Sequence, residues 1–169
     1  MADLVREVVP VLLADGSAAQ WEMSIDVDGS AFRLELRATD GREWAAEGVG
    51  VYASLRVLRR QLEQDDIAIG CNGALPNARP SPFAARCGGW TVDLLHKWRP
   101  ATAGDVVWTL GPVSPTKVAT VEEQDAHLAS LSRVSFSNIL ARCSPVWFVC
   151  FLVSRFGRAV PRYLRGSGP

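Results

Sequence analysis

The chain has 169 residues, which is enough for one well-buried core and short for two, so we expect one domain with appendages. Its 48% apolar and 21% charged residues are typical of a globular protein. The net charge is zero, but residues 1–131 carry 12 basic and 18 acidic side chains, whereas residues 132–169 carry six arginines and no acid. This asymmetry predicts a domain over residues 1–131 and an arginine-rich apolar tail over residues 132–169. The acidic first part argues against nucleic acid as a partner, because phosphates bind basic surfaces.

Four cysteines occur in the sequence, with no Cys-x-x-Cys pair of the kind that holds zinc. The glycines near position 70 follow neither of the glycine-rich patterns that bind nucleotides. We therefore predict no metal and no cofactor. Residues 1–20 contain no charged segment followed by an apolar stretch and a small-residue cleavage site, so we expect a cytoplasmic protein with reduced thiols.

Three segments near the start of the chain have the composition or alternation of β-strands: residues 5–13, 21–27 and 32–38. An Asp-Gly turn follows each of them, which predicts an antiparallel meander with one face in water. Pro10 has no backbone N–H, so we expect the first segment to be an edge strand or two short pieces.

The apolar period changes after residue 48. Val51, Leu55, Leu58 and Leu62 recur at steps of three and four residues, so residues 49–63 are predicted to form an amphipathic helix. Tyr52 is expected at the border of its apolar stripe. Outside the stripe we place three arginines, Arg56, Arg59 and Arg60.

The remaining segments complete the predicted domain. Residues 67–69 are expected to form a buried central strand, and residues 90–98 and 106–110 two further strands. Residues 120–131 are predicted to be a helix with Thr120 as N-cap and Glu123 completing a capping box. The predicted fold class is α+β, with a two-layer, mainly antiparallel sheet of five or six strands, two helices and the C-terminal tail.

The segment after residue 69 is predicted to be a rigid polar loop. Pro76, Pro80 and Pro82 restrict its backbone, so little entropy would be lost on binding. It is the leading candidate for a binding surface, with six candidate residues: Asn72, Asn77, Arg79, Ser81, Phe83 and Arg86. Two alternatives stay open: a plain connector, and a loop in which Phe83 is a core residue that closes the open end of the sheet.

Cys71 and His96 are the weak candidates for a thiol-dependent active site, because a nucleophilic cysteine needs a base. Asp93 and His96 are three residues apart on a predicted strand and so point to opposite faces, which argues against a local dyad. A buried structural cysteine is the commoner role.

Residues 144–154 of the tail contain no charge, and arginines flank them. A helix over residues 143–154 would span about 18 Å, which is too short for a hydrocarbon core of ~30 Å. We therefore predict no membrane-spanning helix in the tail. The tail leaves open an interfacial helix on an anionic membrane surface, packing against the protein's own domain, and packing against a second copy in a homodimer.

The residues Cys-Asn-Gly-Ala-Leu-Pro-Asn-Ala-Arg-Pro-Ser at 71–81, together with residues 118–125, carry a resemblance. Through them the chain from residue 44 to residue 131 resembles a small family of uncharacterised actinobacterial proteins. Because these proteins have no assigned activity, the resemblance implies no catalytic residue. The tail after residue 131 departs from the family pattern.

The leading functional hypothesis is a non-enzymatic protein-binding or regulatory module that uses residues 71–86. One alternative is a small thiol-dependent enzyme that uses Cys71. The other is a membrane-surface protein held by its C-terminal tail.

Overall fold

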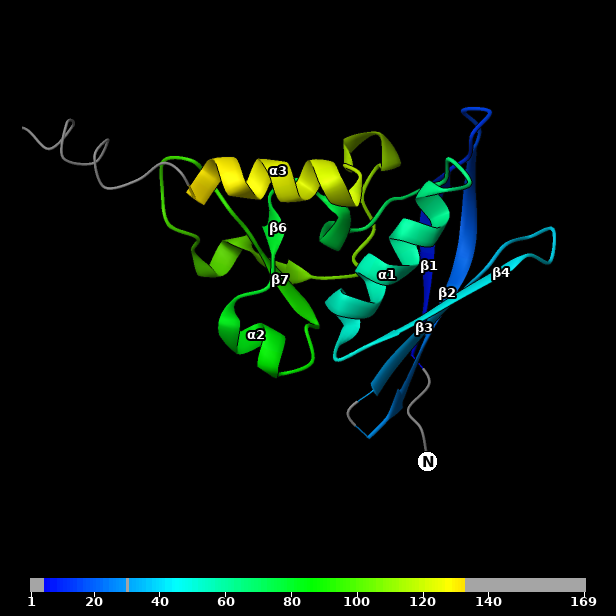
Figure 1. Cartoon of the computed structure of the whole chain (residues 1–169), viewed down its shortest axis with the longest axis horizontal. Helices are drawn as coiled ribbons and strands as arrows, with labels where there is room; N and C mark the ends of the chain where they lie inside the picture. Colours follow the sequence, from blue (N-terminus) through cyan, green and yellow to red (C-terminus); the bar gives the residue numbers. More distant parts are fainter. Residues whose placement is uncertain (1–4, 30, 133–169) are drawn as a thin grey trace, which may run out of the picture. The chain divides into compact units, whose positions relative to one another are not determined.

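The computed structural model describes residues 5–29 and 31–132, so the predicted tail lies outside the described residues except for Ser132 (Figure 1). By its internal contacts the chain divides after Ser132. The predicted α+β class is confirmed, with antiparallel pairing throughout the described sheets. The described strands form two sheets, of five and three strands, instead of one sheet of five or six.

The larger sheet has the strand order β4-β3-β2-β1-β5. Its strands are β1 (Val5–Leu12), β2 (Ala18–Asp28), β3 (Ala31–Arg37), β4 (Glu43–Gly48) and β5 (Ala68–Ile69). The predicted meander of the first three strands is confirmed, and its two turns contain Gly16 and Gly29 at positive φ, where glycine is favoured. The prediction missed β4, because its alanines and glycine have little preference for strands.

Two expectations about this sheet are wrong. Pro10 does not mark an edge or a break, because β1 is continuous and lies between β2 and β5. The carbonyl oxygen of Pro10 accepts a hydrogen bond from the Gly70 N–H at 2.7 Å. The position of the missing Pro10 N–H faces the same side of β1. On that side β5 pairs with only two residues of β1, Val11 and Leu12, so Pro10 interrupts no pairing. Residues 67–69 are not central either, since the two-residue β5 ends the strand order.

Helix α1 (Val51–Glu63) covers one face of this sheet and packs against β3, β4 and β5 (Figure 1). The four apolar residues of the predicted stripe are fully buried, as expected. Tyr52 and Arg59 are also buried, which corrects their predicted positions at the border and outside the stripe. Arg59 follows Leu55 by four residues and precedes Leu62 by three, so helical geometry alone places it on the apolar face.

The smaller sheet consists of β6 (Ala78–Arg79), β7 (Thr91–Leu94) and β8 (Val106–Trp108), in that order. Its helices are the short α2 (Pro82–Arg86), which the prediction missed, and α3 (Val121–Ser132). The predicted capping box of α3 is confirmed: the Thr120 N–H donates to Glu123 Oε2 at 2.9 Å, and the Glu123 N–H donates to Thr120 Oγ1 at 3.2 Å.

No helix among residues 5–29 and 31–132 is long and apolar enough to cross a membrane.

Candidate functional site

Residues 71–86 form a structured segment and not the loop that the sequence suggested. The segment contains a 3₁₀ turn at Asn72–Ala74, strand β6 and helix α2. Cys71 begins it and forms an isolated antiparallel bridge with Pro112. The prolines that predicted a rigid backbone lie within this folded segment. Pro82 is in the first turn of α2, where a backbone N–H would have no partner inside the helix, so its missing N–H removes no helical hydrogen bond.

Three of the six predicted binding residues use their side chains to hold this segment in place. The Asn72 side-chain amide donates to the Trp108 carbonyl oxygen at 3.0 Å. The Asn77 side-chain amide donates to the Leu95 carbonyl oxygen at 2.9 Å. Ser81 Oγ accepts a hydrogen bond from the Ala84 N–H at 3.1 Å and thereby caps α2. These contacts account for the three polar residues without a partner molecule.

The other three predicted binding residues point into solvent. Arg79, Phe83 and Arg86 are all exposed, and we call them the α2 surface. The Phe83 side chain is 70% exposed, so the alternative in which it is a core residue closing the sheet is wrong. Within the described residues, no hydrogen bond or ion pair involves the guanidinium of Arg79 or of Arg86.

Both ends of α2 are fixed. The Ser81 cap and Pro82 define its first turn. At its end, Gly88 and Gly89 have φ angles of 88° and 64°, and the Gly89 N–H donates to the Ala84 carbonyl oxygen at 2.8 Å. The Gly88 carbonyl oxygen then accepts a hydrogen bond from the Val51 N–H at 2.7 Å, which ties α2 to the start of α1.

Arg79 also lines a surface hollow of about 360 Å³ where α1, β6 and α3 meet. We call it the arginine hollow. Its lining residues are Tyr52, Arg56, Arg79, Pro80, Asp125, Leu128 and Ala129.

One charged pair is already formed in the arginine hollow. Both terminal nitrogens of Arg56 donate to the Asp125 carboxylate, at 2.8 and 2.7 Å, and this bidentate bond holds the pKa of Asp125 below its usual range. The same bond raises the pKa of Arg56. The two residues are 69 positions apart, so the sequence carried no signal that would have paired them.

Two buried polar side chains, Arg59 and Gln124, donate hydrogen bonds to the backbone of residues 73–78. Arg59 donates to Gln124 Oε1 at 2.7 Å and to the Ala119 carbonyl oxygen. The Gln124 amide nitrogen lies within hydrogen-bonding distance of the carbonyl oxygens of Gly73, Leu75 and Ala78 at 3.0, 2.7 and 3.1 Å. Neither residue was predicted to be buried, although Arg59 lies on the apolar stripe of α1.

Cys71 belongs neither to the α2 surface nor to the arginine hollow. Its side chain is fully buried, and this burial raises the pKa of the thiol to about 11. Among the described residues, no hydrogen bond joins it to His96 or to His127. A neutral, inaccessible thiol is a poor nucleophile, so this geometry does not favour catalysis by Cys71.

His96 lies beyond the end of β7, which corrects its expected position within a strand. Its Nε2 is 2.9 Å from an oxygen of Asp105. Arg99 donates two hydrogen bonds to that carboxylate, at 2.5 and 2.7 Å, and Thr102 donates two more through its backbone and hydroxyl. Arg99 and then Thr102 hold the pKa of Asp105 far below its usual range. The cluster therefore fastens the 95–105 loop around the Asp105 carboxylate.

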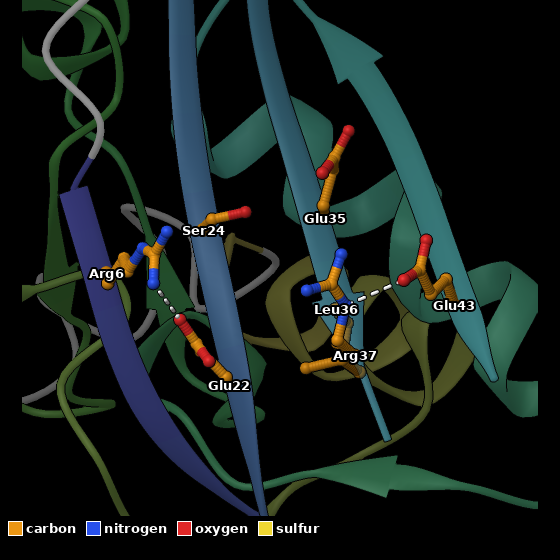
Figure 2. A pocket seen from close by; sticks show the side chains of 7 residues that line it. All are labelled: Arg6, Glu22, Ser24, Glu35, Leu36, Arg37 and Glu43. Carbon is orange, nitrogen blue, oxygen red and sulfur yellow. Dashed lines mark hydrogen bonds and ion pairs between the residues drawn. The ribbon is translucent and has the colours of Figure 1, made fainter. Parts of the chain in front are cut away.

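A second hollow, of about 140 Å³, lies on the open face of the larger sheet (Figure 2). Its charges pair across neighbouring strands, with Arg6 at 3.1 Å from Glu22 and Arg37 at 2.6 Å from Glu43. Glu35, in the same hollow, pairs with Arg33 at 2.8 Å. Cross-strand ion pairs of this kind stabilise the sheet and leave no lining arginine unpaired, so we do not choose this face as the site.

No known protein-family model matches the chain, and no curated protein matches it in sequence.

Proposed function

We propose that this chain is a non-enzymatic protein-binding module that contacts its partner through the α2 surface. The observation that carries the proposal is the 70% exposure of Phe83 on a helix whose two ends are fixed. Burying a phenylalanine side chain fully is worth about 1.5–3 kcal/mol, and the described fold leaves most of that free energy unused. A partner with an apolar pocket would recover it.

The charges around Phe83 support the same proposal. Arg79 and Arg86 have no acidic partner among the described residues, and arginine and aromatic residues are enriched at interface hot spots. Two exposed arginines within four residues of Phe83 in the chain favour a partner whose apolar pocket has acidic residues at its rim.

The rigid support of α2 favours binding without a large loss of entropy. The capping hydrogen bond from Ala84 to Ser81 and the Val51–Gly88 hydrogen bond order the helix before any partner arrives. Preordered contact residues lose less conformational entropy on binding than mobile ones do.

The two alternatives have less support. The thiol-dependent enzyme was expected to use Cys71, and the burial of Cys71 makes that thiol inaccessible as a nucleophile. The membrane-surface hypothesis depends on the tail, which lies outside the described residues.

We further propose a cytoplasmic location and kinship with the actinobacterial family. The location is supported by Cys71 and Cys87, which are both free thiols, with Cys87 exposed as a reducing compartment allows. The kinship rests on the 71–81 segment of the sequence.

The proposal is tested by immobilising the full chain, exposing it to a lysate of the source organism and quantifying the bound proteins by mass spectrometry. We expect one or a few proteins to bind the unaltered chain and to be lost with both Phe83→Ala and Arg79→Ala. Each substitution should weaken binding by about 1–4 kcal/mol. Both variants should unfold within about 0.5 kcal/mol of the parent, because neither side chain is buried.

The matched control is Val8→Ala, which shortens another exposed apolar side chain, 60% exposed and on the larger sheet. It should retain every partner. If no bound protein distinguishes Phe83→Ala from Val8→Ala, the α2 surface is not a protein-binding site. If the bound protein is a second copy of this chain, light scattering will show a dimer that Phe83→Ala converts to a monomer.

A further inference from the structure

We propose that the arginine hollow is a carboxylate-binding site that takes an acidic side chain of the partner peptide. This inference rests on the proposed function, because it assigns a chemical class to the part of the partner that reaches Arg79. It goes further in committing to one ligand group and one arginine.

The first argument is the unequal use of the two arginines. Arg56 is engaged by Asp125 through two hydrogen bonds, whereas Arg79 has none with any described residue. A guanidinium has five N–H donors arranged as a planar fork, and a carboxylate matches this fork with two parallel hydrogen bonds. Arg79 is therefore the group in this hollow that is left for a ligand.

The second argument is charge. The lining holds two guanidinium groups and one carboxylate, which leaves one positive charge for a ligand. A side-chain carboxylate carries one negative charge and neutralises it. A phosphate would carry close to two and would face the Asp125 carboxylate across the same hollow, so like-charge repulsion disfavours it.

The third argument is the apolar part of the lining. Pro80 and Leu128 are each half-buried and border the hollow beside Arg79. They can contact the aliphatic part of an acidic side chain or an apolar neighbour of it. A peptide that combines an acid with apolar neighbours therefore fits better than a free inorganic anion.

The test titrates two peptides, acetyl-Leu-Glu-Leu-amide and acetyl-Leu-Gln-Leu-amide, into the ¹⁵N-labelled full chain while backbone amide signals are recorded by NMR. We expect the signals of Arg79 and Asp125 to shift saturably below about 10 mM of the glutamate peptide, with an affinity about tenfold higher than for the glutamine peptide. Arg79→Gln should abolish this preference. Arg79→Lys should restore part of it, since lysine keeps the charge but not the fork.

The matched control is Arg6→Gln, which removes an exposed arginine of the larger sheet and should leave the preference for glutamate unchanged. Equal affinity for the two peptides, a preference that survives Arg79→Gln, or no Arg79-dependent shift would each overturn the inference. Tighter binding of acetyl-Leu-phosphoserine-Leu-amide than of the glutamate peptide would overturn it as well. If the inference fails while Phe83→Ala still loses its partner, the proposed function stands alone.

Discussion

Cys71 lies between β5 and the 3₁₀ turn at Asn72–Ala74, with its side chain fully buried in the core. Desolvation raises the pKa of the thiol, and the opposing charge of the Arg59 guanidinium lowers it by less. The outcome is a thiol that stays protonated to about pH 11 in the folded chain. Burial decides the chemistry of this residue.

This shift predicts that stability falls at high pH. The unfolded chain releases the Cys71 proton near pH 8.5, whereas the folded chain keeps it up to a pKa of about 11, so the free energy of unfolding decreases as pH rises between these values. The loss should be about 3 kcal/mol in the parent chain. Urea unfolding of the parent and of Cys71→Ala, each at a series of pH values, measures it.

The two proteins are compared by the slope of their free energy of unfolding against pH. The absolute free energies are not compared, because Cys71→Ala also removes buried volume. We expect the slope between pH 8.5 and 11 to be flatter in the variant. Identical slopes in the two proteins would mean that the Cys71 thiol ionises in the folded chain as easily as in the unfolded one.

At the scale of elements, strongly periodic segments were predictable and short irregular ones were not. The β1–β3 meander and α1 follow from apolar spacing, and the α3 cap follows from Thr120 and Glu123. By contrast, the only buried residue of β4 is Ala46, and α2 has five residues, too few for a periodic pattern. Short elements are stabilised by tertiary contacts, such as the Gly88–Val51 hydrogen bond, which the sequence does not display.

The residues of the candidate site also divide into those that the sequence predicted and those that it did not. The prolines around Arg79 and Phe83 indicated a rigid segment, and for that reason the sequence analysis selected these two residues. The structure leaves both of them exposed. It did not indicate Arg56, Asp125 or Leu128, since these residues come from α1 and α3 and reach the hollow only through the packing of helices distant in sequence. Contacts across 69 residues are a property of the fold.

The segment from the 3₁₀ turn to β6 depends on Gln124 of α3. Its amide group lies against the carbonyl oxygens of Gly73, Leu75 and Ala78, and its oxygen accepts from Arg59. Gln124→Leu should remove a hydrogen bond from each of these buried polar groups and lower the free energy of unfolding by about 2–4 kcal/mol. Urea denaturation measures the change.

The control for this prediction is Gln20→Leu, at an exposed position on β2, which should change the free energy of unfolding by less than about 0.5 kcal/mol. We also expect Gln124→Leu to weaken partner binding, because Arg79 follows directly on the Ala78 carbonyl that Gln124 contacts. A Gln124→Leu variant as stable as the parent would show that the segment holds its conformation without this clamp.

At the scale of the whole molecule, the described residues already close a core. α1 covers the larger sheet, and the main cluster of buried residues runs from Val9 to Leu110. α3 adds Gln124 and the Arg56–Asp125 ion pair, and it ends at Ser132, where the chain divides by its internal contacts. Among the described residues, the two sheets are built from strands that lie between Val5 and Trp108.

Deletion of residues 133–169 should therefore leave a folded protein with a single cooperative thermal transition. We expect Tm to change by less than about 4 °C, which corresponds to about 1 kcal/mol for a chain of this size. Six arginines leave with the tail, so the shortened chain carries a net charge of −6 and should bind an anion-exchange column more tightly than the parent. Calorimetry of both chains at equal concentration measures the two Tm values. A broad or absent transition in the shortened chain would mean that residues beyond Ser132 are part of the cooperative fold.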